Sequence, residues 1–312
     1  MRNKIILYAI LAWFSFAFIS IRAPDSFPKD TYFDVQKGSG LSQVATSLSS
    51  AHIIRSPFLF KVFVTLSGNQ KSLVSGVYDF DQPINLLQVI SRISSGKYGL
   101  TSGRVTIPEG SNVFEIGSIL KKYSKNFDRE KFVRIAGAQE GYLFPDTYYF
   151  LPSVTAEEAY GALRANFSKR IVVISDEIAL FKHPLNDVVR MASILEEEAR
   201  TTTSRRIIAG ILWKRISIGM ALQVDAAFQY VNGKGDSADL TLDDLKIDSP
   251  YNTYVYRGFP PTAITNPGLD SLFSAVTPIK TPYLYYLSDK KGEIHYARTF
   301  EEHVANKNKY LR

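Results

Sequence analysis

The 312-residue chain contains no cysteine and only four histidines. The absence of cysteine excludes disulfides, thiol catalysis and cysteine-based zinc sites. The histidines form no His-Glu-x-x-His pattern, and His295 and His303 are too far apart for adjacent turns of one helix, so we predict no metal site. The net charge of +7 includes no block of Lys and Arg, so nucleic-acid binding is not expected.

The composition is that of a globular protein. Hydrophobic residues make up 45% of the chain and charged residues 21%, which is enough apolar material for a sizeable core. The length is sufficient for two domains. The mildly basic charge would tolerate an anionic polymer or a membrane surface as a partner.

A long uncharged run lies near the N-terminus. Arg2 and Lys4 precede the 17 residues Ile5–Ile21, and Arg22 follows them. Seventeen residues is short for a membrane span but longer than the apolar part of a typical cleaved signal peptide. We predict a single transmembrane helix over 1–22 that serves as an uncleaved anchor, with the basic N-terminus in the cytoplasm and the bulk of the chain outside. A cleaved signal peptide is the alternative.

A repeated pattern follows a linker at 23–31. Phe33–Ser39 and Val105–Ser111 each read as a short strand that ends in Gly-Ser before an amphipathic helix, and the Ser is expected to cap that helix. The first copy continues with a helix at 57–67, a strand at 76–80 and a helix at 85–94 that ends at Gly96. We therefore predict a small α/β module at 32–100.

The remainder, 101–312, is predicted to form a larger mixed domain, so that the fold class is α+β. Apolar residues spaced three and four apart predict helices within 151–181, 186–200 and 204–217. The run 283–287 is expected to form a strand that pairs, through a turn at 289–292, with 294–298. A polar helix is expected at 301–311.

The helix at 186–200 carries three consecutive carboxylates within an apolar pattern. At roughly 100° per residue, Leu195 and Ala199 face the core, and Glu197 points into solvent. Glu196 and Glu198 lie on the two flanks of the apolar stripe. Partial desolvation at such a margin can raise the pKa of a carboxyl group, as a general acid at neutral pH requires. A solvated acidic helix is the alternative.

Polar residues among aromatics are typical of sugar-binding clefts, because they hydrogen-bond hydroxyls while rings cover the apolar sugar faces. Gln223, Asp225, Asn252 and Tyr254 fit this description. Gln223 and Asp225 could equally form the polar face of a strand. Asp146, in another such segment, could equally cap a helix.

Five ordered motifs resemble those of the YceG-like (MltG-type) endolytic murein transglycosylases. They are Ala192–Glu198, Ile218–Asp225, Tyr251–Tyr254, Gly258–Gly268 and Thr281–Tyr285. The resemblance covers essentially the whole chain, and it implies an anchor, a LysM-like module at 32–100 and a catalytic domain at 101–312.

The resemblance also implies a reaction and a site. The reaction is cleavage of the MurNAc–GlcNAc β-1,4 bond of peptidoglycan without water, which leaves a 1,6-anhydroMurNAc end. The family's catalytic glutamate falls on Glu196, the first Glu of its Glu-x-Glu pair, and Glu197 replaces a residue that is usually basic. The residues expected to orient Glu196 or to bind glycan are Glu198, Gln223, Asp225, Asn252 and Tyr254.

The implied partners are glycan strands, the cytoplasmic membrane and penicillin-binding proteins. An active site held at the outer face of that membrane would limit the length of nascent strands. No cofactor is expected, because the sequence has no phosphate-binding glycine-rich loop and no evident Schiff-base lysine, which disfavours a cofactor-dependent lyase. A glycan-binding scaffold without catalysis is one alternative. A muramidase that uses Asp225 or Glu198 as its second carboxylate is another.

Overall fold

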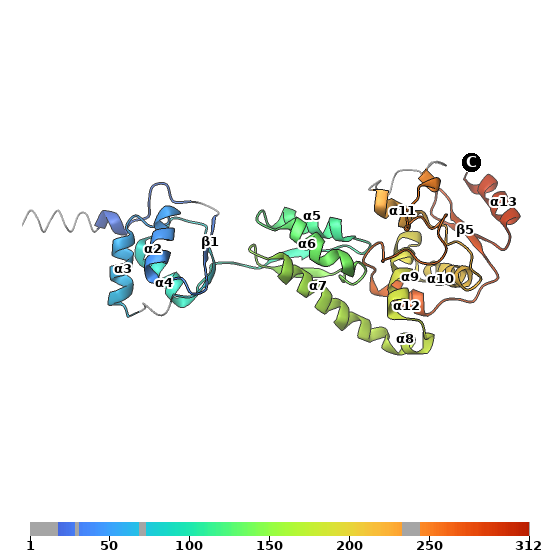
Figure 1. The fold of residues 1–312 in the computed structure, drawn as a ribbon, viewed down its shortest axis with the longest axis horizontal. Helices are drawn as coiled ribbons and strands as arrows, with labels where there is room; N and C mark the ends of the chain where they lie inside the picture. The colour runs from blue at the N-terminus through green and yellow to red at the C-terminus, as the bar shows by residue number, and fades with distance from the viewer. Residues whose placement is uncertain (1–17, 29–30, 69–72, 233–243, 312) are drawn as a thin grey trace, which may run out of the picture. The chain divides into compact units, whose positions relative to one another are not determined.

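The computed structural model describes residues 18–28, 31–68, 73–232 and 244–311. The chain divides into an N-terminal unit, residues 1–103 with 151–153, and a C-terminal unit, residues 104–150 with 154–312 (Figure 1). Among the described residues, no helix combines the length and the hydropathy that crossing a membrane requires. Most of the predicted transmembrane helix at 1–22 lies outside the described residues.

The described part of the N-terminal unit contains an antiparallel sheet of β1 (Thr31–Val35) and β2 (Gly76–Phe80) and the helices α2 (Leu41–Ser50), α3 (Pro57–Leu66) and α4 (Leu86–Ser95), at the positions that the sequence predicts. Thr31 lies opposite Phe80 and Val35 opposite Gly76. Gly96 ends α4 in the left-handed conformation at φ 65°, which confirms the predicted C-cap.

The predicted serine caps are wrong in both copies of the repeat. The N-cap of α2 is Gly40, which has no side chain to accept a hydrogen bond. The next copy leads into α5 (Val113–Tyr123), whose N-cap is Asn112 rather than Ser111. The Asn112 side chain accepts from the Glu115 N–H at 3.0 Å while the Glu115 carboxylate accepts from the Asn112 N–H at 2.9 Å. This reciprocal capping box satisfies two free N–H groups, whereas a serine cap one residue earlier would satisfy fewer.

The first part of the C-terminal unit has its own core. Its elements are β3 (Gly103–Thr106), α5, α6 (Arg129–Ala136), β4 (Thr147–Phe150) and α7 (Ala156–Ile171). β3 pairs with β4. Asp146, next to β4, caps no helix. Its carboxylate instead accepts from Arg170 at 2.6 Å, Asn166 at 3.1 Å and the Thr147 N–H at 2.8 Å.

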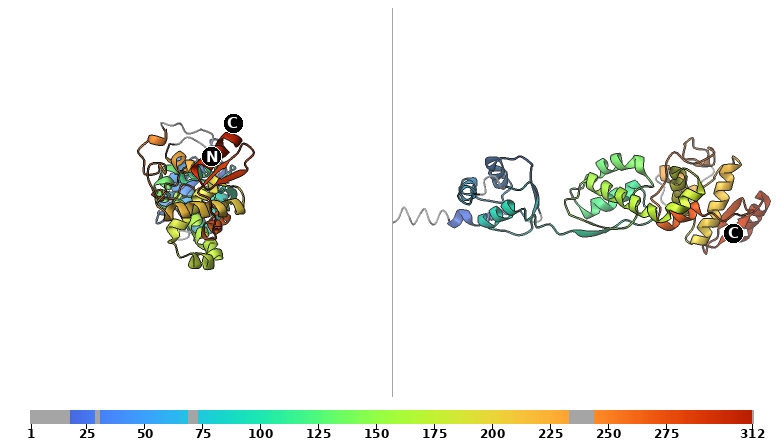
Figure 2. Two further views of the ribbon diagram at one scale, coloured as in Figure 1. Left: turned by 90° about the vertical axis from the view of Figure 1, so that its right-hand side faces the viewer. Right: turned by 90° about the horizontal axis from the view of Figure 1, so that it is seen from below.

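The second part of the C-terminal unit is mainly helical (Figure 2). Its elements are α8 (Ser175–Phe181), α9 (Leu185–Glu198), α10 (Thr202–Ser217), α11 (Asp225–Asn232), α12 (Leu269–Val276), β5 (Tyr285–Ser288), β6 (Ile294–Ala297) and α13 (Phe300–Tyr310). The predicted helices, the antiparallel hairpin and the terminal helix are thereby confirmed. The single helix expected within 151–181 is divided into α7 and α8 by a 3₁₀ turn at Val172–Ile174. The mixed α+β class is also confirmed.

The helix α9 lies at the centre of this part and packs against α10, α11 and α12. The apolar stripe predicted for it is buried, and its members are Val188, Met191, Ala192, Leu195 and Ala199. Ile194, outside that stripe, is buried as well. The packing of α9 against several partners fixes the position of its last turn, which carries the three carboxylates.

Candidate active site

Glu196 and Glu198 share the last turn of α9, and the exposed Glu197 lies between them, as the helical period predicts. Because successive residues point about 100° apart, the two flanking carboxylates meet different neighbours. Each therefore has its own cluster of contacts.

The Glu196 carboxylate is bound on both oxygens. Oε1 accepts a hydrogen bond from Nη2 of Arg205, with which it forms a close ion pair, and Oε2 accepts from the Gly268 N–H at 2.7 Å. The Glu196 side chain is only 5% exposed. Charge-assisted hydrogen bonds are roughly twice as strong as neutral ones, so these contacts fix the position of the carboxylate.

Arg205 joins this carboxylate to two other segments. Its Nη1 donates to Asp270 at 2.7 Å, and its Nε donates to the carbonyl oxygen of Ala199 at 2.9 Å. Thr202 also donates to Asp270, at 2.7 Å. We call Glu196, Arg205 and Asp270 the Arg205 cluster. It connects the end of α9 to the starts of α10 and α12.

A fourth charged residue borders the Arg205 cluster. Loss of solvent around the Glu109 carboxyl raises its pKa, and the negative charge of Glu196 acts in the same direction. A Cβ atom at Gly268 would lie 2.0 Å from Oε1 of Glu109. A side chain at position 268 would therefore displace the Glu109 carboxylate from the start of α12.

The Glu198 carboxyl has different surroundings. Burial raises its pKa to about 7, and the Asp225 carboxylate raises it further, while a hydrogen bond from Tyr286 and the charge of Arg215 act in the opposite direction. The residue nevertheless keeps part of its surface accessible to solvent. A carboxyl group that holds its proton up to neutral pH meets the protonation requirement of a general acid.

Asp225 and Tyr254 stand beside Glu198. The Tyr254 hydroxyl donates to Oδ1 of Asp225 at 2.5 Å. Burial and the Asp225 carboxylate both raise the pKa of Tyr254, so its phenol keeps the donated proton. We call Glu198, Asp225, Tyr254 and Tyr286 the Glu198 cluster, and its four side chains come from four separate segments.

Arg215, on α10, lies next to this cluster and is buried. Its guanidinium donates to the carbonyl oxygens of Leu284 at 2.7 Å and Leu222 at 2.6 Å, and it lies 5.2 Å from the ring centre of Tyr285. These bonds tie α10 to the turn before Asp225 and to the start of β5. Arg215 thus holds together the segments that carry the Glu198 cluster.

The other two predicted binding residues have different positions. Gln223 is exposed in a left-handed conformation at φ 52°, and its N–H donates to the carbonyl oxygen of Thr253 at 3.1 Å. Because Asp225 begins α11, the strand alternative for these residues is wrong. Asn252 is fully buried, and its amide donates to the carbonyl oxygens of Leu245 and Ile247 at 3.0 and 2.9 Å. The structure therefore gives Asn252 a role in shaping its own loop.

The Asn266-Pro267-Gly268 segment is structural as well. The buried Asn266 side chain donates to the Ser111 carbonyl at 2.9 Å and to Glu140 at 2.6 Å, and it accepts from the Gly141 N–H at 2.9 Å. Burial raises the pKa of Glu140 to about 7, and Tyr230 donates to its other oxygen at 3.0 Å. This network joins the two parts of the C-terminal unit.

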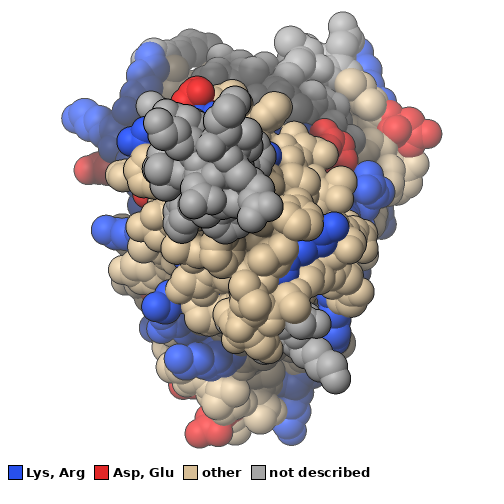
Figure 3. Space-filling view, turned by 90° about the vertical axis from the view of Figure 1, so that its left-hand side faces the viewer, with Lys and Arg blue, Asp and Glu red and all other residues tan. Residues whose placement is uncertain are grey.

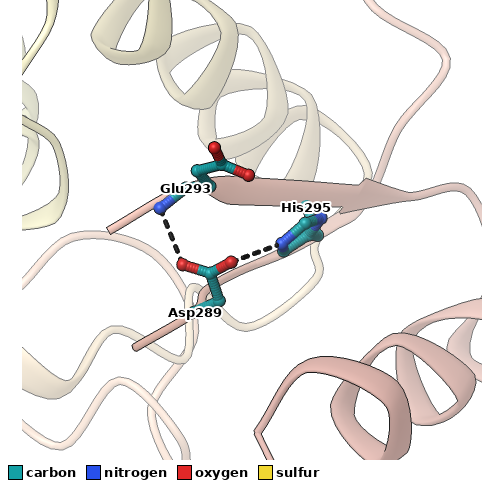
Figure 4. A group of neighbouring side chains, drawn as sticks. All are labelled: Asp289, Glu293 and His295. Atoms are coloured by element: carbon teal, nitrogen blue, oxygen red, sulfur yellow. Dashed lines mark hydrogen bonds and ion pairs between the residues drawn. The ribbon is translucent and has the colours of Figure 1, made fainter. Parts of the chain in front are cut away.

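Asp289, Glu293 and His295 offer three side-chain ligand atoms close together in the β5–β6 hairpin (Figure 4). Oδ1 of Asp289 accepts from the N–H groups of Lys291 and Glu293 at 2.8 and 2.9 Å, and Oδ2 lies 3.1 Å from Nε2 of His295. The His295 ring is stacked 3.5 Å from that of Tyr310. These contacts stabilise the hairpin turn, and we assign no metal to them.

A hollow of about 400 Å³ lies apart from the Glu198 cluster. It is lined by Val173, Ile174, Glu177, Leu269, Asp270 and Phe273. These residues are mostly apolar and come from α8, α12 and the turn before α8. The hollow therefore adds no polar group to the Glu198 cluster.

Comparison with known proteins identifies the family. The model of the YceG-like family matches residues 33–309. The chain belongs to the YceG-like family. It is 31% identical over 305 residues to an endolytic murein transglycosylase of Bacillus subtilis (strain 168), with 89% of this chain and 84% of that protein covered.

Two further relatives support this membership. An endolytic murein transglycosylase of Streptococcus pneumoniae (strain R6) is 26% identical over 313 residues, and the match spans 87% of this chain but 57% of that longer protein. The crystal structure of a YceG-like protein of Listeria monocytogenes superposes with a TM-score of 0.60 at 26% identity, covering 89% of this chain and 99% of the other. The fold of this YceG-like chain therefore agrees with one found by experiment.

The structure brings together three of the six predicted site residues, Glu198, Asp225 and Tyr254. It places Glu196 in the Arg205 cluster. The sequence analysis missed Arg205, Arg215 and Tyr286. The sequence contained one signal for the two arginines, because the helical spacing places both on the buried stripe of α10. The stripe contains Arg205, Ile208, Leu212 and Arg215, which are three, four and three residues apart. A charged residue on a buried stripe indicates a specific partner.

Proposed function

We propose that this chain is an endolytic murein transglycosylase that cleaves the MurNAc–GlcNAc β-1,4 bond of peptidoglycan, with Glu198 as its acid and base. The names of its curated relatives support the activity and the peptidoglycan substrate. The observation that carries the residue assignment is the raised pKa of the Glu198 carboxyl, which burial and the nearby Asp225 carboxylate bring to about 7.

The proposed reaction needs one proton donor and one proton acceptor in sequence. Protonated Glu198 gives its proton to the glycosidic oxygen as the bond from that oxygen to C1 of MurNAc breaks. The C6 hydroxyl of the same MurNAc then attacks C1, and its proton passes to the Glu198 carboxylate. The 1,6-anhydro ring forms and the acid is regenerated, so no water is consumed.

The neighbours of Glu198 support this sequence of steps. The transition state of glycosidic cleavage resembles an oxocarbenium ion, and the Asp225 carboxylate can stabilise its positive charge. The hydrogen bond from Tyr254 fixes the orientation of Asp225. Tyr286 donates to Glu198, and burial keeps its pKa far above neutrality, so it can steady the carboxylate after the proton has left.

Glu196, which the family resemblance designates, remains the alternative acid. Both of its oxygens accept hydrogen bonds, one from Arg205 and one from the Gly268 N–H, and its side chain is almost fully buried. In our proposal Glu196 therefore stabilises the last turn of α9, on which Glu198 stands.

The proposed location is the outer face of the cytoplasmic membrane. The uncharged run Ile5–Ile21, between basic residues, supports a single-pass anchor. The strand–helix–helix–strand order of β1, α2, α3 and β2 supports a LysM-like module that adds contacts to glycan. Contact with penicillin-binding proteins is part of the same proposal and follows from the family resemblance.

Mass spectrometry of reaction products tests the proposed function. Full-length protein would be incubated with uncrosslinked glycan strands, in parallel with Glu198→Gln and Glu196→Gln. New 1,6-anhydroMurNAc ends that disappear only with Glu198→Gln would support the activity and the residue assignment. Loss with Glu196→Gln alone would return the role of acid to Glu196.

The same experiment tests the two other functions. Reducing MurNAc ends would indicate hydrolysis, a reaction for which Asp225, close enough to raise the pKa of Glu198, supplies a second carboxylate. Glycan that binds but stays intact with every form of the protein would indicate a scaffold. Either result would overturn the proposed transglycosylase.

A further inference from the structure

One helix of the N-terminal unit exposes large apolar side chains. Phe58 is 67% exposed and Leu66 is 77% exposed, and both belong to α3. Together with the partly exposed Val62 they are spaced four residues apart, so they share one face of the helix. The face extends about 12 Å along the helix axis, given a rise of about 1.5 Å per residue.

This face begins where the N-terminal uncharged run ends. The guanidinium of Arg55, two residues before α3, donates to the Ala23 carbonyl at 3.1 and 3.0 Å and pairs with Asp25 at 2.8 Å. Ile21 and Ala23 pack against the core of the unit. The exit of the chain from the run is thereby fixed next to the first turn of α3 (Figure 1).

The last residues of the run add apolar surface near that point. Phe18 is 66% exposed and Ile19 is also exposed, and the Arg22 guanidinium lies 5.5 Å from the ring centre of Phe18. Figure 3 shows uncharged residues together with Lys and Arg beside the atoms that are not described. Apolar and aromatic side chains bordered by basic ones are typical of segments that lie in a membrane interface.

We propose that the outer face of α3, formed by Phe58, Val62 and Leu66, lies on the lipid bilayer into which residues 5–21 insert. This inference rests on the proposed anchor. The surface is the outer leaflet of a phospholipid membrane, and the apolar side chains reach about 5–10 Å into the boundary between headgroups and acyl chains. The N-terminal unit is then held against the membrane by two contacts, the anchor and α3. Such an arrangement restricts how far the N-terminal unit can turn about the anchor.

The absence of cysteine makes a direct test possible. Single variants Phe58→Cys and Leu66→Cys would each carry one polarity-sensitive fluorophore on an otherwise cysteine-free chain. The full-length labelled proteins would be reconstituted in vesicles of phosphatidylcholine and phosphatidylglycerol and floated on a density gradient. We expect each fluorophore to emit at a shorter wavelength in the vesicles than in detergent-free buffer after the lipid has been removed. We also expect lipids brominated on the upper acyl chain to quench it.

Leu180→Cys is the matched control, since Leu180 is 80% exposed but lies in the C-terminal unit on α8. A label there is expected to report water and to escape quenching by the brominated lipids. Quenching at position 180 equal to that at 58 and 66 would mean that labels enter the bilayer without preference, and would overturn the proposal.

Flotation tests the anchor separately from the contact of α3 with the membrane. Protein that floats with the vesicles while labels at 58 and 66 report water would overturn the α3 contact and leave the anchor standing. Protein that fails to float would overturn both. The peptidoglycan activity is measured separately in the product assay, so neither result depends on catalysis.

Discussion

Glu196 and Glu198 are two residues apart on one helix, but their carboxyl groups have opposite environments. Glu196 faces a guanidinium and the N–H of Gly268, at the start of α12. Glu198 faces Tyr286, and the carboxylate of Asp225 is near enough to raise its pKa. A cation and a helix N-terminus stabilise the charged form of an acid, whereas burial and a second anion stabilise the neutral form.

The difference shows that position on the apolar margin of a helix does not decide the role of a carboxylate. Both residues occupy that margin, one on each flank. The partner that reaches each flank decides the role, and the partners come from distant parts of the chain. Substitutions at the two positions should therefore have opposite consequences for activity and for stability.

The largest expected effect is on catalysis by Glu198→Gln. The amide keeps the size of the side chain but cannot donate a proton to the glycosidic oxygen. General acid–base catalysis contributes about 10²–10⁴-fold to a rate, so the rate of anhydro-end formation should fall by at least that range. Product counting by mass spectrometry measures it. Glu197→Gln, on the exposed side of the same turn, is the control and should cleave normally.

The next effect is on stability, and it belongs to Glu196→Gln. Removing one partner of a buried ion pair costs about 3–5 kcal/mol, and we expect the lower end because Arg205 keeps its bond to Asp270. Urea unfolding followed by circular dichroism measures the loss. Folded Glu196→Gln protein should retain cleavage. An unchanged unfolding midpoint together with abolished cleavage would contradict our assignment and support Glu196 as the acid.

The contrast between the two glutamates could be predicted from the sequence only in part. The three- and four-residue apolar spacing correctly predicts α9, its buried stripe and the outward direction of Glu197, because these depend on local geometry alone. The same spacing predicts α10, and an apolar run followed by a turn predicts the β5–β6 hairpin. It cannot tell the two flanks apart, because Gly268 and Tyr286 are 72 and 88 residues from their carboxylate partners in the chain.

Competing hydrogen bonds act at the secondary positions as well. Asn252 has the residue type of a sugar ligand, and its amide donates to carbonyl groups of the segment just before it. Ser111 precedes a helix as a cap would, but Asn112 takes the capping position through its reciprocal bonds with Glu115. Residue type predicts which hydrogen bonds are possible, and the fold decides which are made.

A smaller effect concerns the pH dependence of stability. In the folded protein Glu198 keeps its proton up to a pKa of about 7, whereas a glutamate in the unfolded chain loses it near pH 4.3. Between these values the folded state binds more protons, so the free energy of unfolding falls as pH rises. Glu198→Gln removes this contribution to the fall of the free energy of unfolding.

Glu198→Gln should thus be more stable than the parent at pH 8, by up to about 4 kcal/mol for a shift of this size, with little difference near pH 4. Urea unfolding of both proteins at the two pH values gives the comparison. A Glu198→Gln protein that loses stability at pH 8 would show that the folded state prefers the ionised carboxylate at position 198.

The smallest expected effect is a displacement of the pH–rate profile by Asp225→Asn. Because protonated Glu198 is the reactive form, kcat/KM of the parent should decline above a pH of about 7. Asp225 raises the pKa of Glu198 through its negative charge, so the asparagine variant should lose activity at lower pH. Burial is the larger cause, and the displacement should therefore stay below about 1 pH unit.

Asp225→Asn should also lower the maximum rate, because the neutral amide no longer stabilises positive charge on the sugar. The alkaline limb of the pH–rate profile separates the lower maximum rate from the change in the pKa of Glu198. A rate that is reduced equally at every pH leaves this limb at the same pH. A limb that moves to lower pH identifies Asp225 as a determinant of the Glu198 proton. A limb that stays fixed would mean that the titrating acid lies elsewhere, and Glu109 or Glu196 of the neighbouring cluster would be examined next.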